Sequence, residues 1–273
     1  MATKPWEGKQ LDILHREDRG TVAHLTMNAP ERLNALSDAM LAALTECLDT
    51  IAQDPDIRVV VLAGAGKAFC AGHDLKEMQA GRAAEDGGAA YFKDLFDRCA
   101  ALMLRIQSLP QPVIAQVHGI ATAAGCQLVA TCDMAVAADD ARFGVNGVNI
   151  GLFCSTPMVA LTRNISRKAA FEMLTTGRFI NAREAYELGL INSAVHSDVL
   201  ARETAELADV IARKLPAAVR IGKEAFYKQS EMTTPEAYAY AGEVMTRNML
   251  DSDTDEGISA FLQKRAASWA VSD

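Results

Sequence analysis

The 273-residue chain lacks several patterns that commonly assign a function. It contains no Gly-x-Ser-x-Gly and no His-Glu-x-x-His motif, which argues against an α/β-hydrolase and against a zinc metalloprotease. Gly64–Lys67 begins like a nucleotide-binding loop, but it lacks the third glycine of a dinucleotide fingerprint, and Ala68 follows the lysine where a P-loop has Ser or Thr. A plain turn after a strand is therefore the simpler interpretation of this segment.

Paired cysteines and an excess of positive charge are also missing. None of the six cysteines forms a Cys-x-x-Cys pair. They are Cys47, Cys70, Cys99, Cys126, Cys132 and Cys154. Each lies in an apolar stretch, so we expect buried free thiols in a reducing compartment and no metal site. Acidic residues outnumber basic ones by 35 to 27, which gives a formal charge of −8 and argues against a nucleic-acid partner.

Long hydrophobic runs are absent as well. Met1–Lys9 has no apolar core of the kind that signal peptides carry. The most hydrophobic stretch, Pro112–Ala138, is interrupted by polar residues such as Gln116 and Asp133 and by Gly119. A buried strand, turn and helix explain this stretch better than a membrane span does. We therefore expect a cytoplasmic protein without a membrane partner.

Strand and helix patterns alternate through the first two thirds of the chain. Val59–Leu62 is a short β-branched run of the kind found in strands buried on both faces, and Val113–Val117 is a second predicted strand. Ala39–Ile51 and Tyr91–Ser108 have the apolar spacing of amphipathic helices. Ala80–Ala90, rich in glycine, alanine and acidic residues, is typical of a loop. This alternation predicts an α/β core.

Helical periodicity alone continues from Lys168 to the end of the chain. The predicted helices are Lys168–Thr176, Ala182–Leu188, Val199–Lys214, Ala217–Gln229, Pro235–Met249 and Thr254–Lys264. An alternating segment followed by an all-helical one indicates two parts. We place the core at residues 1–198 and a helical C-terminal region at residues 199–273.

Two segments, Ala68–Met78 and Val117–Leu128, suggest a site. Each has the pattern of a strand that runs into a turn of small residues and then opens a helix. Such turns present backbone N–H groups at a helix N-terminus, where negative charge is favoured. Two such turns facing each other would form an oxyanion hole.

Further motifs extend this pattern over nearly the whole chain. They are Asn34–Leu36, Pro112–Ala115, Cys132–Ala137, Leu174–Arg178, Ala182–Ala185, Gly189–Ile191 and Ala260–Arg265. Together with the two turns they closely resemble the crotonase superfamily, also called the enoyl-CoA hydratase/isomerase family. The resemblance implies an α/β fold, a spiral of ββα units with a C-terminal helical trimerisation region, assembled as homotrimers or dimers of trimers. It also implies an acyl-CoA or enoyl-CoA thioester as the ligand, with coenzyme A as part of the substrate, no other cofactor and no metal.

The resemblance places functional roles on particular residues. The two oxyanion donors correspond to the backbone N–H groups of His73 and Ala124, and each such donor contributes about 3 kcal/mol in other enzymes. The residues that would contact the substrate are Arg32, Ala35, Ala71, Asp74, Leu75, Lys76 and Lys264. Lys76, Arg32 and Lys264 would meet the CoA phosphates, with Lys264 reaching in from a neighbouring subunit.

The sequence departs from the family where hydratases carry two catalytic glutamates. Gln127 stands at one of these positions and Gly147 at the other, with Asn146 in place of the preceding proline. Neither Gln nor Gly exchanges protons near neutral pH, so efficient hydration is not expected, and Asn146 becomes a candidate polar group. The run Gly147–Pro157 is similar to one branch of the superfamily that is linked to fatty-acid metabolism.

Three functions remain open at this point. The first, which we favour, is a lyase or isomerase acting on CoA thioesters with a rearranged set of acid–base groups. The second is a CoA-thioester-binding protein without turnover, and the third is a structural subunit assembled with active relatives. The His73 side chain is open too, either as a structural residue that caps the helix after it or as an acid–base group.

Overall fold

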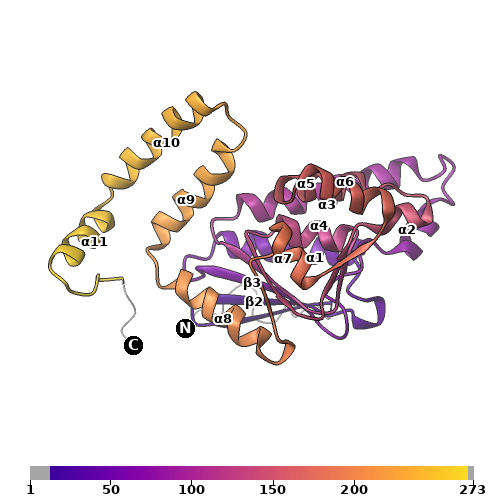
Figure 1. The fold of residues 1–273 in the computed structure, drawn as a ribbon, viewed down its shortest axis with the longest axis horizontal. Helices are drawn as coiled ribbons and strands as arrows, with labels where there is room; N and C mark the ends of the chain where they lie inside the picture. The colour runs from indigo at the N-terminus through magenta and orange to yellow at the C-terminus, as the bar shows by residue number, and fades with distance from the viewer. Residues whose placement is uncertain (1–12, 270–273) are drawn as a thin grey trace.

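The computed structural model describes residues 13–269, arranged as two sheets with helices around them (Figure 1). The expectation for Met1–Lys9 lies outside these residues. Across the larger sheet the strands are ordered β1 (Leu14–Arg19), β2 (Val22–Met27), β3 (Val59–Gly64), β4 (Val113–Val117), β6 (Met134–Ala138) and β9 (Ser193–Val195). Only the β1–β2 pair is antiparallel, and the other neighbours run parallel. The buried β-branched strands predicted from the sequence are thus confirmed as β3 and β4.

A smaller sheet lies beside the larger one and supports the site. It is made of β5 (Ile120–Thr122), β7 (Arg142–Gly144) and β8 (Phe179–Asn181). β5 and β7 run parallel, and Thr122 pairs with Gly144 at the end of both strands. The carboxyl ends of β5 and β7 therefore open side by side, at the edge where parallel sheets usually place functional residues.

Helices connect the strands and cover the sheets. In the described residues they are α1 (Asp38–Ala52), α2 (Leu75–Gly81), α3 (Ala89–Ser108), α4 (Ala124–Thr131), α5 (Ser155–Asn164), α6 (Arg167–Thr176), α7 (Ala182–Leu188), α8 (Leu200–Ala212), α9 (Pro216–Gln229), α10 (Thr234–Met249) and α11 (Ser252–Leu262), with 3₁₀ turns at Pro30–Arg32, Asn146–Ile150 and Ser197–Val199. The Ser37 hydroxyl caps α1 by accepting from the Met40 N–H at 3.2 Å. None of these helices combines the length and apolar character needed to cross a membrane.

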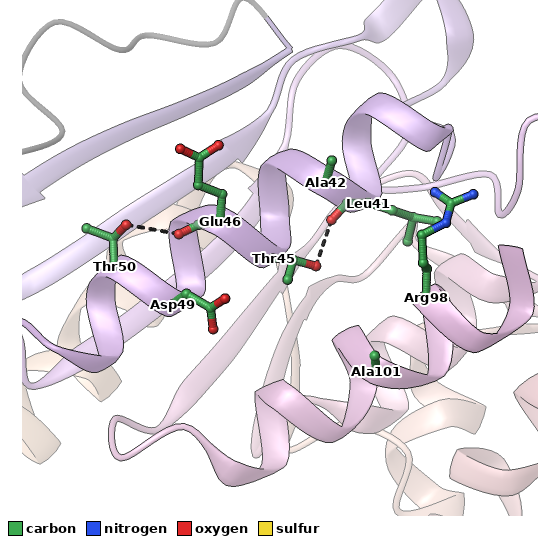
Figure 2. A pocket seen from close by; sticks show the side chains of 8 residues that line it. All are labelled: Leu41, Ala42, Thr45, Glu46, Asp49, Thr50, Arg98 and Ala101. Atoms are coloured by element: carbon green, nitrogen blue, oxygen red, sulfur yellow. Dashed lines mark hydrogen bonds between the residues drawn. The ribbon is translucent and has the colours of Figure 1, made fainter. Parts of the chain in front are cut away.

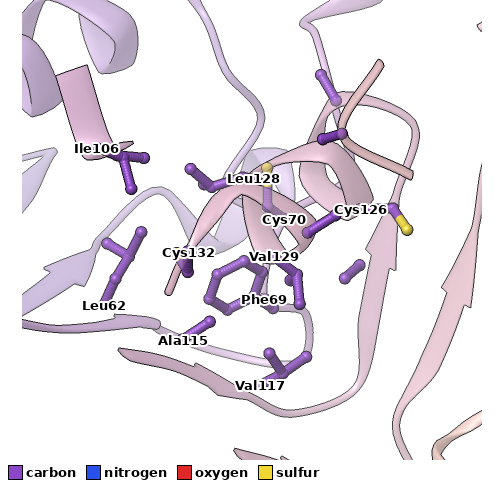
Figure 3. Packing of buried hydrophobic residues seen from close by; sticks show 14 of the residues in the cluster. Leu62, Phe69, Cys70, Ile106, Ala115, Val117, Cys126, Leu128, Val129 and Cys132 are labelled. Carbon is purple, nitrogen blue, oxygen red and sulfur yellow. The ribbon is translucent and has the colours of Figure 1, made fainter. Parts of the chain in front are cut away.

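The main core lies around α4, all of whose residues are buried. Phe69 and Phe143, with no exposed surface, are among the largest fully buried side chains. Figure 3 shows Phe69 beneath α4, with Cys70, Cys126 and Val129 nearby. Burial raises the pKa of the Cys70 and Cys126 thiols to about 12. All six cysteines are free, and all but the half-buried Cys47 are buried.

The predicted helical region 199–273 contains two parts that pack differently. α8 lies against the larger sheet, where Leu200, Ala208 and Ala212 join a buried cluster with Val59 and Val61. In contrast, α9, α10 and α11 extend away from the sheets as an arm (Figure 1). Helix α8 therefore packs as part of the core, and the extended arm begins at α9.

A buried ion pair attaches the arm to the core. Lys223 of α9 donates from Nζ to Ile106 O at 2.8 Å, to Gln111 O at 3.0 Å and to Asp133 Oδ2 at 2.6 Å. The Tyr227 hydroxyl donates to the other carboxylate oxygen of Asp133 at 2.9 Å. All three ammonium hydrogens are thus used, which is the condition for burying a lysine without a large penalty.

Beyond this attachment the arm exposes large apolar side chains. The most exposed are Phe226, Tyr238, Met245, Met249, Leu250, Phe261 and Leu262. Exposed apolar groups gathered on one element mark interaction surfaces more often than chance would give.

Candidate functional site

The two turns predicted to form the site are in direct contact. The Thr122 N–H donates to Cys70 O at 3.0 Å. A Cβ atom added to Gly125 would lie 2.1 Å from Cys70 O, and one added to Gly72 would lie 3.2 Å from the Ala124 nitrogen. Only residues without a side chain permit this approach. Two glycines thus hold the first turn against the start of α4.

Both predicted donor groups lack a hydrogen-bond partner within residues 13–269. Ala124 is the first residue of α4, where the helix itself offers its N–H no acceptor. On the other turn the carbonyl of Gly72 accepts from the Leu36 N–H at 2.7 Å, and the His73 N–H of the same trans peptide, which points the opposite way, has no backbone acceptor in the described chain. Two free backbone donors on touching turns are the arrangement that stabilises an anionic oxygen.

The second turn contains a strained alanine. Ala123 has φ +50° and ψ −120°, a backbone conformation that residues other than glycine rarely adopt. Its N–H donates to Gly144 O at 2.9 Å, so the contact with β7 helps to hold it there. Such strain costs on the order of 1–3 kcal/mol and is found most often at functional sites.

The His73 side chain does not cap α2 and instead packs against Leu36 and Phe96. Its Nδ1 lies 3.4 Å from Leu36 O, and its ring meets the edge of Phe96 on α3 with centroids 5.7 Å apart. Burial lowers the pKa of His73, and its Nε2 has no partner in the described part of the chain. The cap of α2 is Asp74, as its position before the helix predicts, so the capping alternative for His73 is wrong.

The flank of the site around α2 is charged and internally paired. Asp74 Oδ1 accepts from the N–H groups of Lys76 at 2.8 Å and Glu77 at 3.3 Å. Arg32 Nη1 lies 3.2 Å from Asp74 Oδ2 and 3.4 Å from Glu77 Oε1. Glu77 Oε2 in turn accepts from the Asp38 N–H at 2.8 Å, at the start of α1. The carboxylates of Asp74 and Glu77 are therefore both bound, by N–H groups at helix starts and by Arg32.

Most of the predicted substrate contacts gather on this flank. The Ala71 N–H donates to Leu33 O at 3.0 Å, which brings Ala71 beside the buried Ala35 and the turn that carries Arg32. Leu75 is 55% exposed, and Lys76 is exposed beside it. Lys264 follows α11, which Figure 1 shows well away from α2. One chain thus brings together all of the predicted contacts except Lys264.

The opposite flank carries neutral groups. The Thr122 hydroxyl donates to Asn146 Oδ1 at 2.6 Å, just after the ends of β5 and β7. Gly147 has no room for a side chain, because an added Cβ would lie 2.4 Å from Leu152 O and 2.9 Å from Cys154 Sγ. Burial raises the pKa of Cys154, which keeps its thiol protonated at neutral pH.

Gln127, at the other glutamate position, is nearly buried. It is 5% exposed, and its Oε1 atom has no partner within residues 13–269. An unpaired buried amide oxygen is uncommon and marks a place where a ligand group or water completes the bonding. Sequence reasoning named Gln127 and Asn146 but missed Thr122 as the partner of Asn146, since 24 positions separate the two residues.

A separate surface hollow of about 590 Å³ lies between α1 and α3 (Figure 2). It is lined by Leu41, Ala42, Thr45, Glu46, Asp49, Thr50, Arg98 and Ala101. None of the predicted site residues is among them. No group of three or more potential metal ligands occurs within residues 13–269.

Comparison with known families bears on this geometry. Residues 17–271 match the sequence model of a family described as "Enoyl-CoA hydratase/isomerase". The chain belongs to this family. Membership of the crotonase superfamily, predicted from the motifs, and with it the crotonase fold are thereby confirmed.

Individual relatives support the family and its branch. "Enoyl-CoA hydratase domain-containing protein 3, mitochondrial" of Xenopus laevis is 43% identical, with 96% of this chain and 87% of the relative covered. A crystal structure of an enoyl-CoA hydratase from Mycobacterium smegmatis is 55% identical, with a TM-score of 0.90 and 94% and 98% of the two chains covered. The human structure of the domain-containing protein 3 has a TM-score of 0.90 and 42% identity, covering 94% of this chain and all of that one. This is the branch that the run Gly147–Pro157 resembles.

The names of these relatives correct one prediction. The relatives from Xenopus laevis, Danio rerio and Homo sapiens are all named as mitochondrial proteins. The cytoplasmic location expected from the sequence is contradicted by this finding. That expectation depended on the missing apolar run in Met1–Lys9, and this absence does not exclude other routes to a compartment.

Proposed function

We propose that this enoyl-CoA hydratase/isomerase family member binds an acyl-CoA or enoyl-CoA thioester and stabilises an enolate of it. The thioester oxygen accepts hydrogen bonds from the backbone N–H groups of His73 and Ala124. The observation that carries this proposal is the contact of the two turns at Gly72 and Gly125, with both N–H groups left without a partner in the described chain. Fixed donors of this kind stabilise developing charge without reorganisation.

Coenzyme A, as part of the substrate, occupies the charged flank in this proposal. The contacts are Arg32, Ala35, Ala71, Asp74, Leu75 and Lys76, with Lys264 supplied by another subunit. The exposed ammonium of Lys76 supports a phosphate contact, because lysine binds phosphate as a point charge. Arg32 keeps its two carboxylate partners and serves mainly to hold the turn. No other cofactor and no metal are needed.

Efficient hydration of an enoyl-CoA is not part of the proposal. A proton-transfer group typically contributes about 10²–10⁴ in rate. Gln127 and Asn146 carry amides, and Gly147 has no room for any side chain. The lyase or isomerase therefore operates mainly through its oxyanion hole. The alternative is a non-catalytic CoA-thioester-binding protein or a structural subunit.

Assembly into a homotrimer or a dimer of trimers completes the proposal. The exposed apolar side chains of α9, α10 and α11 support it, since an arm of this kind is stable when a second copy covers it. Light scattering coupled to size exclusion gives the mass of the assembly directly. A monomer at micromolar concentration contradicts this part.

Binding of a 3-oxoacyl-CoA tests the oxyanion hole itself. Acetoacetyl-CoA enolises readily, and its enolate absorbs in the near ultraviolet, so the wild-type protein should raise this absorbance on binding. Gly72→Ala should abolish the rise, because the added Cβ would lie 3.0 Å from Ala123 Cβ and close to the Ala124 nitrogen.

The control for this experiment is Gly222→Ala, a glycine of α9 with no atom within 4 Å of an added Cβ. It should leave the enolate absorbance unchanged, and the melting temperature checks that both variants are folded. Equal enolate absorbance in the wild type and in folded Gly72→Ala would contradict the proposed hole. Loss of the signal in the control would show that the assay reports folding alone.

A further inference from the structure

A hollow of about 240 Å³ lies at the edge of the larger sheet that is remote from the candidate site. Two of its lining residues, Arg58 and Gln111, come just before β3 and β4. The hollow therefore opens at the amino ends of these parallel strands, whereas the two turns of the site follow their carboxyl ends. The end of α1, the end of α8 and the start of α9 complete its walls.

Positive charge dominates this hollow. Arg58, Lys214 and Arg220 line it, and none of the three has a carboxylate partner within the described residues. Asp54 is the one carboxylate among the lining residues, and its Oδ2 already accepts from Arg16 Nη2 at 3.3 Å. Unpaired cations gathered around one hollow attract a negative ligand.

The first turn of α9 adds backbone donors to the same wall. Pro216, Val219 and Arg220 line the hollow. The helix has no side-chain cap, and the N–H groups of Ala217 and Ala218 have no acceptor within residues 13–269. The positive end of a 14-residue helix thus lies beside three cations, and both features favour an anion.

Gln111 narrows the chemistry of that anion. It lines the hollow and is 6% exposed, and its buried Oε1 atom has no hydrogen-bond partner in the described part of the chain. Its Nε2 donates to the carbonyls of Ile51 at 2.9 Å and Ile57 at 3.2 Å, which fixes the orientation of the amide. A bare acceptor among cations calls for a ligand that is negative and still carries an O–H group.

The walls of the hollow are held in place by the fold itself. Pro55, Pro110 and Pro216 line it, and proline restricts the backbone. Arg58 Nη1 donates to Ala212 O at 2.8 Å, which ties the end of α8 to the segment before β3. A preformed site of this kind pays little conformational entropy when a ligand binds.

We propose that this hollow binds a small phosphate that carries a hydroxyl group, either inorganic phosphate or the phosphate of a short phosphorylated polyol. Arg58, Lys214 and Arg220 bind the phosphate oxygens, and the ligand O–H donates to Gln111 Oε1. The volume lies below the roughly 300–1,000 Å³ of pockets for drug-sized ligands, so a whole CoA thioester does not fit. The site is separate from the proposed CoA-thioester site and does not depend on it.

A phosphate bound here also joins the arm to the core. Lys214 and Arg220 flank the start of α9, and Lys223 of the same helix donates to Gln111 O at 3.0 Å. The side chain of Gln111 thus lines the hollow while its carbonyl holds the arm. A ligand in the hollow adds a second attachment to α9 and stabilises the attached arm by mass action.

Titration calorimetry of the full chain tests the site with inorganic phosphate, glycerol 3-phosphate and sulfate at equal ionic strength. Inorganic phosphate or glycerol 3-phosphate should bind with a Kd at or below about 1 mM, and the tighter of the two identifies the source. Sulfate has no proton near neutral pH and leaves Gln111 Oε1 unbonded, so it should bind about 10-fold more weakly.

Two variants assign the role of the cations. Lys214→Gln and Arg220→Gln should each weaken phosphate binding about 10-fold, because each loses a charge-assisted hydrogen bond. The matched control is Lys168→Gln, at an exposed lysine of α6, which Figure 1 shows well away from α8 and α9. It should leave the Kd unchanged. Melting temperatures without phosphate check that all variants are folded.

Hydrogen exchange locates the bound ion. Phosphate should slow exchange at the start of α9 in the wild type and leave α2, beside the proposed CoA site, unchanged. Absence of binding by both phosphates, or protection at α2 in place of α9, overturns the proposal. Equal affinity for sulfate and phosphate overturns the role of Gln111, and wild-type affinity in both Lys214→Gln and Arg220→Gln overturns the role of the cations.

Discussion

The two flanks of the site differ in how they use polar groups. Around α2 the side chains are charged, and each carboxylate already has partners, with Asp74 and Glu77 bound by Arg32 and by backbone N–H groups. Around Asn146 the side chains are neutral: the Asn146 Oδ1 atom accepts from Thr122, and the buried Oε1 atom of Gln127 has no partner in the described chain. Charge therefore stabilises the local fold on one flank, and an unpaired amide oxygen remains available to a ligand on the other.

The largest expected effect on stability comes from a substitution that pushes apart the two turns between the flanks. Gly125→Ala would place a Cβ 2.1 Å from Cys70 O, a backbone atom that cannot move aside alone. We expect a loss of at least about 3 kcal/mol in the free energy of unfolding, measured by urea denaturation. Gly222→Ala, in open space on α9, should change stability by less than about 1 kcal/mol. Equal stability of the two variants would show that the turns do not pack as described.

The charged flank should lose stability when its cap is removed. Asp74→Ala deletes the acceptor of two N–H groups at the start of α2 and one partner of Arg32, and should cost about 1–2 kcal/mol. Asp74→Ser keeps an acceptor and removes the charge, so it should recover most of this loss. Thermal melting compares the two variants. If Ser and Ala were equally unstable, the ion pair with Arg32 would matter more than the cap.

The neutral flank should gain stability when its strain is relieved. Ala123→Gly allows φ +50° and ψ −120° without steric conflict and should raise the free energy of unfolding by about 1 kcal/mol. The same change at Ala239, exposed within α10, should lower it by about 1 kcal/mol, because glycine weakens a regular helix. Destabilisation by both substitutions would contradict strain at Ala123.

The smallest effect is a pH dependence from His73. Burial lowers its pKa in the folded state, so as the pH falls below about 6.5 the unfolded chain binds the proton first, and stability declines. His73→Phe should flatten this decline in urea titrations between pH 7 and pH 5. Some slope should remain, because burial also lowers the pKa of His24. His196→Gln, at an exposed histidine, serves as the control and should keep the full wild-type slope.

The sequence predicted the long elements better than the short ones. Val113–Val117 matches β4, and Tyr91–Ser108 falls within α3, because both have clear apolar periodicity. The three-residue strands of the smaller sheet are too short to show a period, and their pairing depends on partners far along the chain. α5 was missed because Ser155–Asn164 mixes polar and apolar residues without a strong stripe.

The backbone of the site was more predictable than its side chains. Small residues after a strand indicated the two turns, and the structure brings those turns into contact. The pairing of Arg32 with Asp74 and of Thr122 with Asn146 joins residues that are far apart in the sequence. No local pattern encodes such pairs, since they depend on how whole elements pack. The roles assigned to His73 and Ala124 stay predictions until the enolate is observed.

The attachment of the arm also determines which motions can reach the site. Lys223 binds Gln111 and Asp133, which lie just before β4 and β6. Both residues are thus at the amino ends of two neighbouring parallel strands. The turn with Ala124 follows β5, which comes after the opposite end of β4, a strand of five residues and thus about 16 Å long. A swing of α9 would strain the amino ends of these strands before it displaced either of the proposed oxyanion donors, His73 and Ala124. The sheet thus separates the proposed site from movement in the arm.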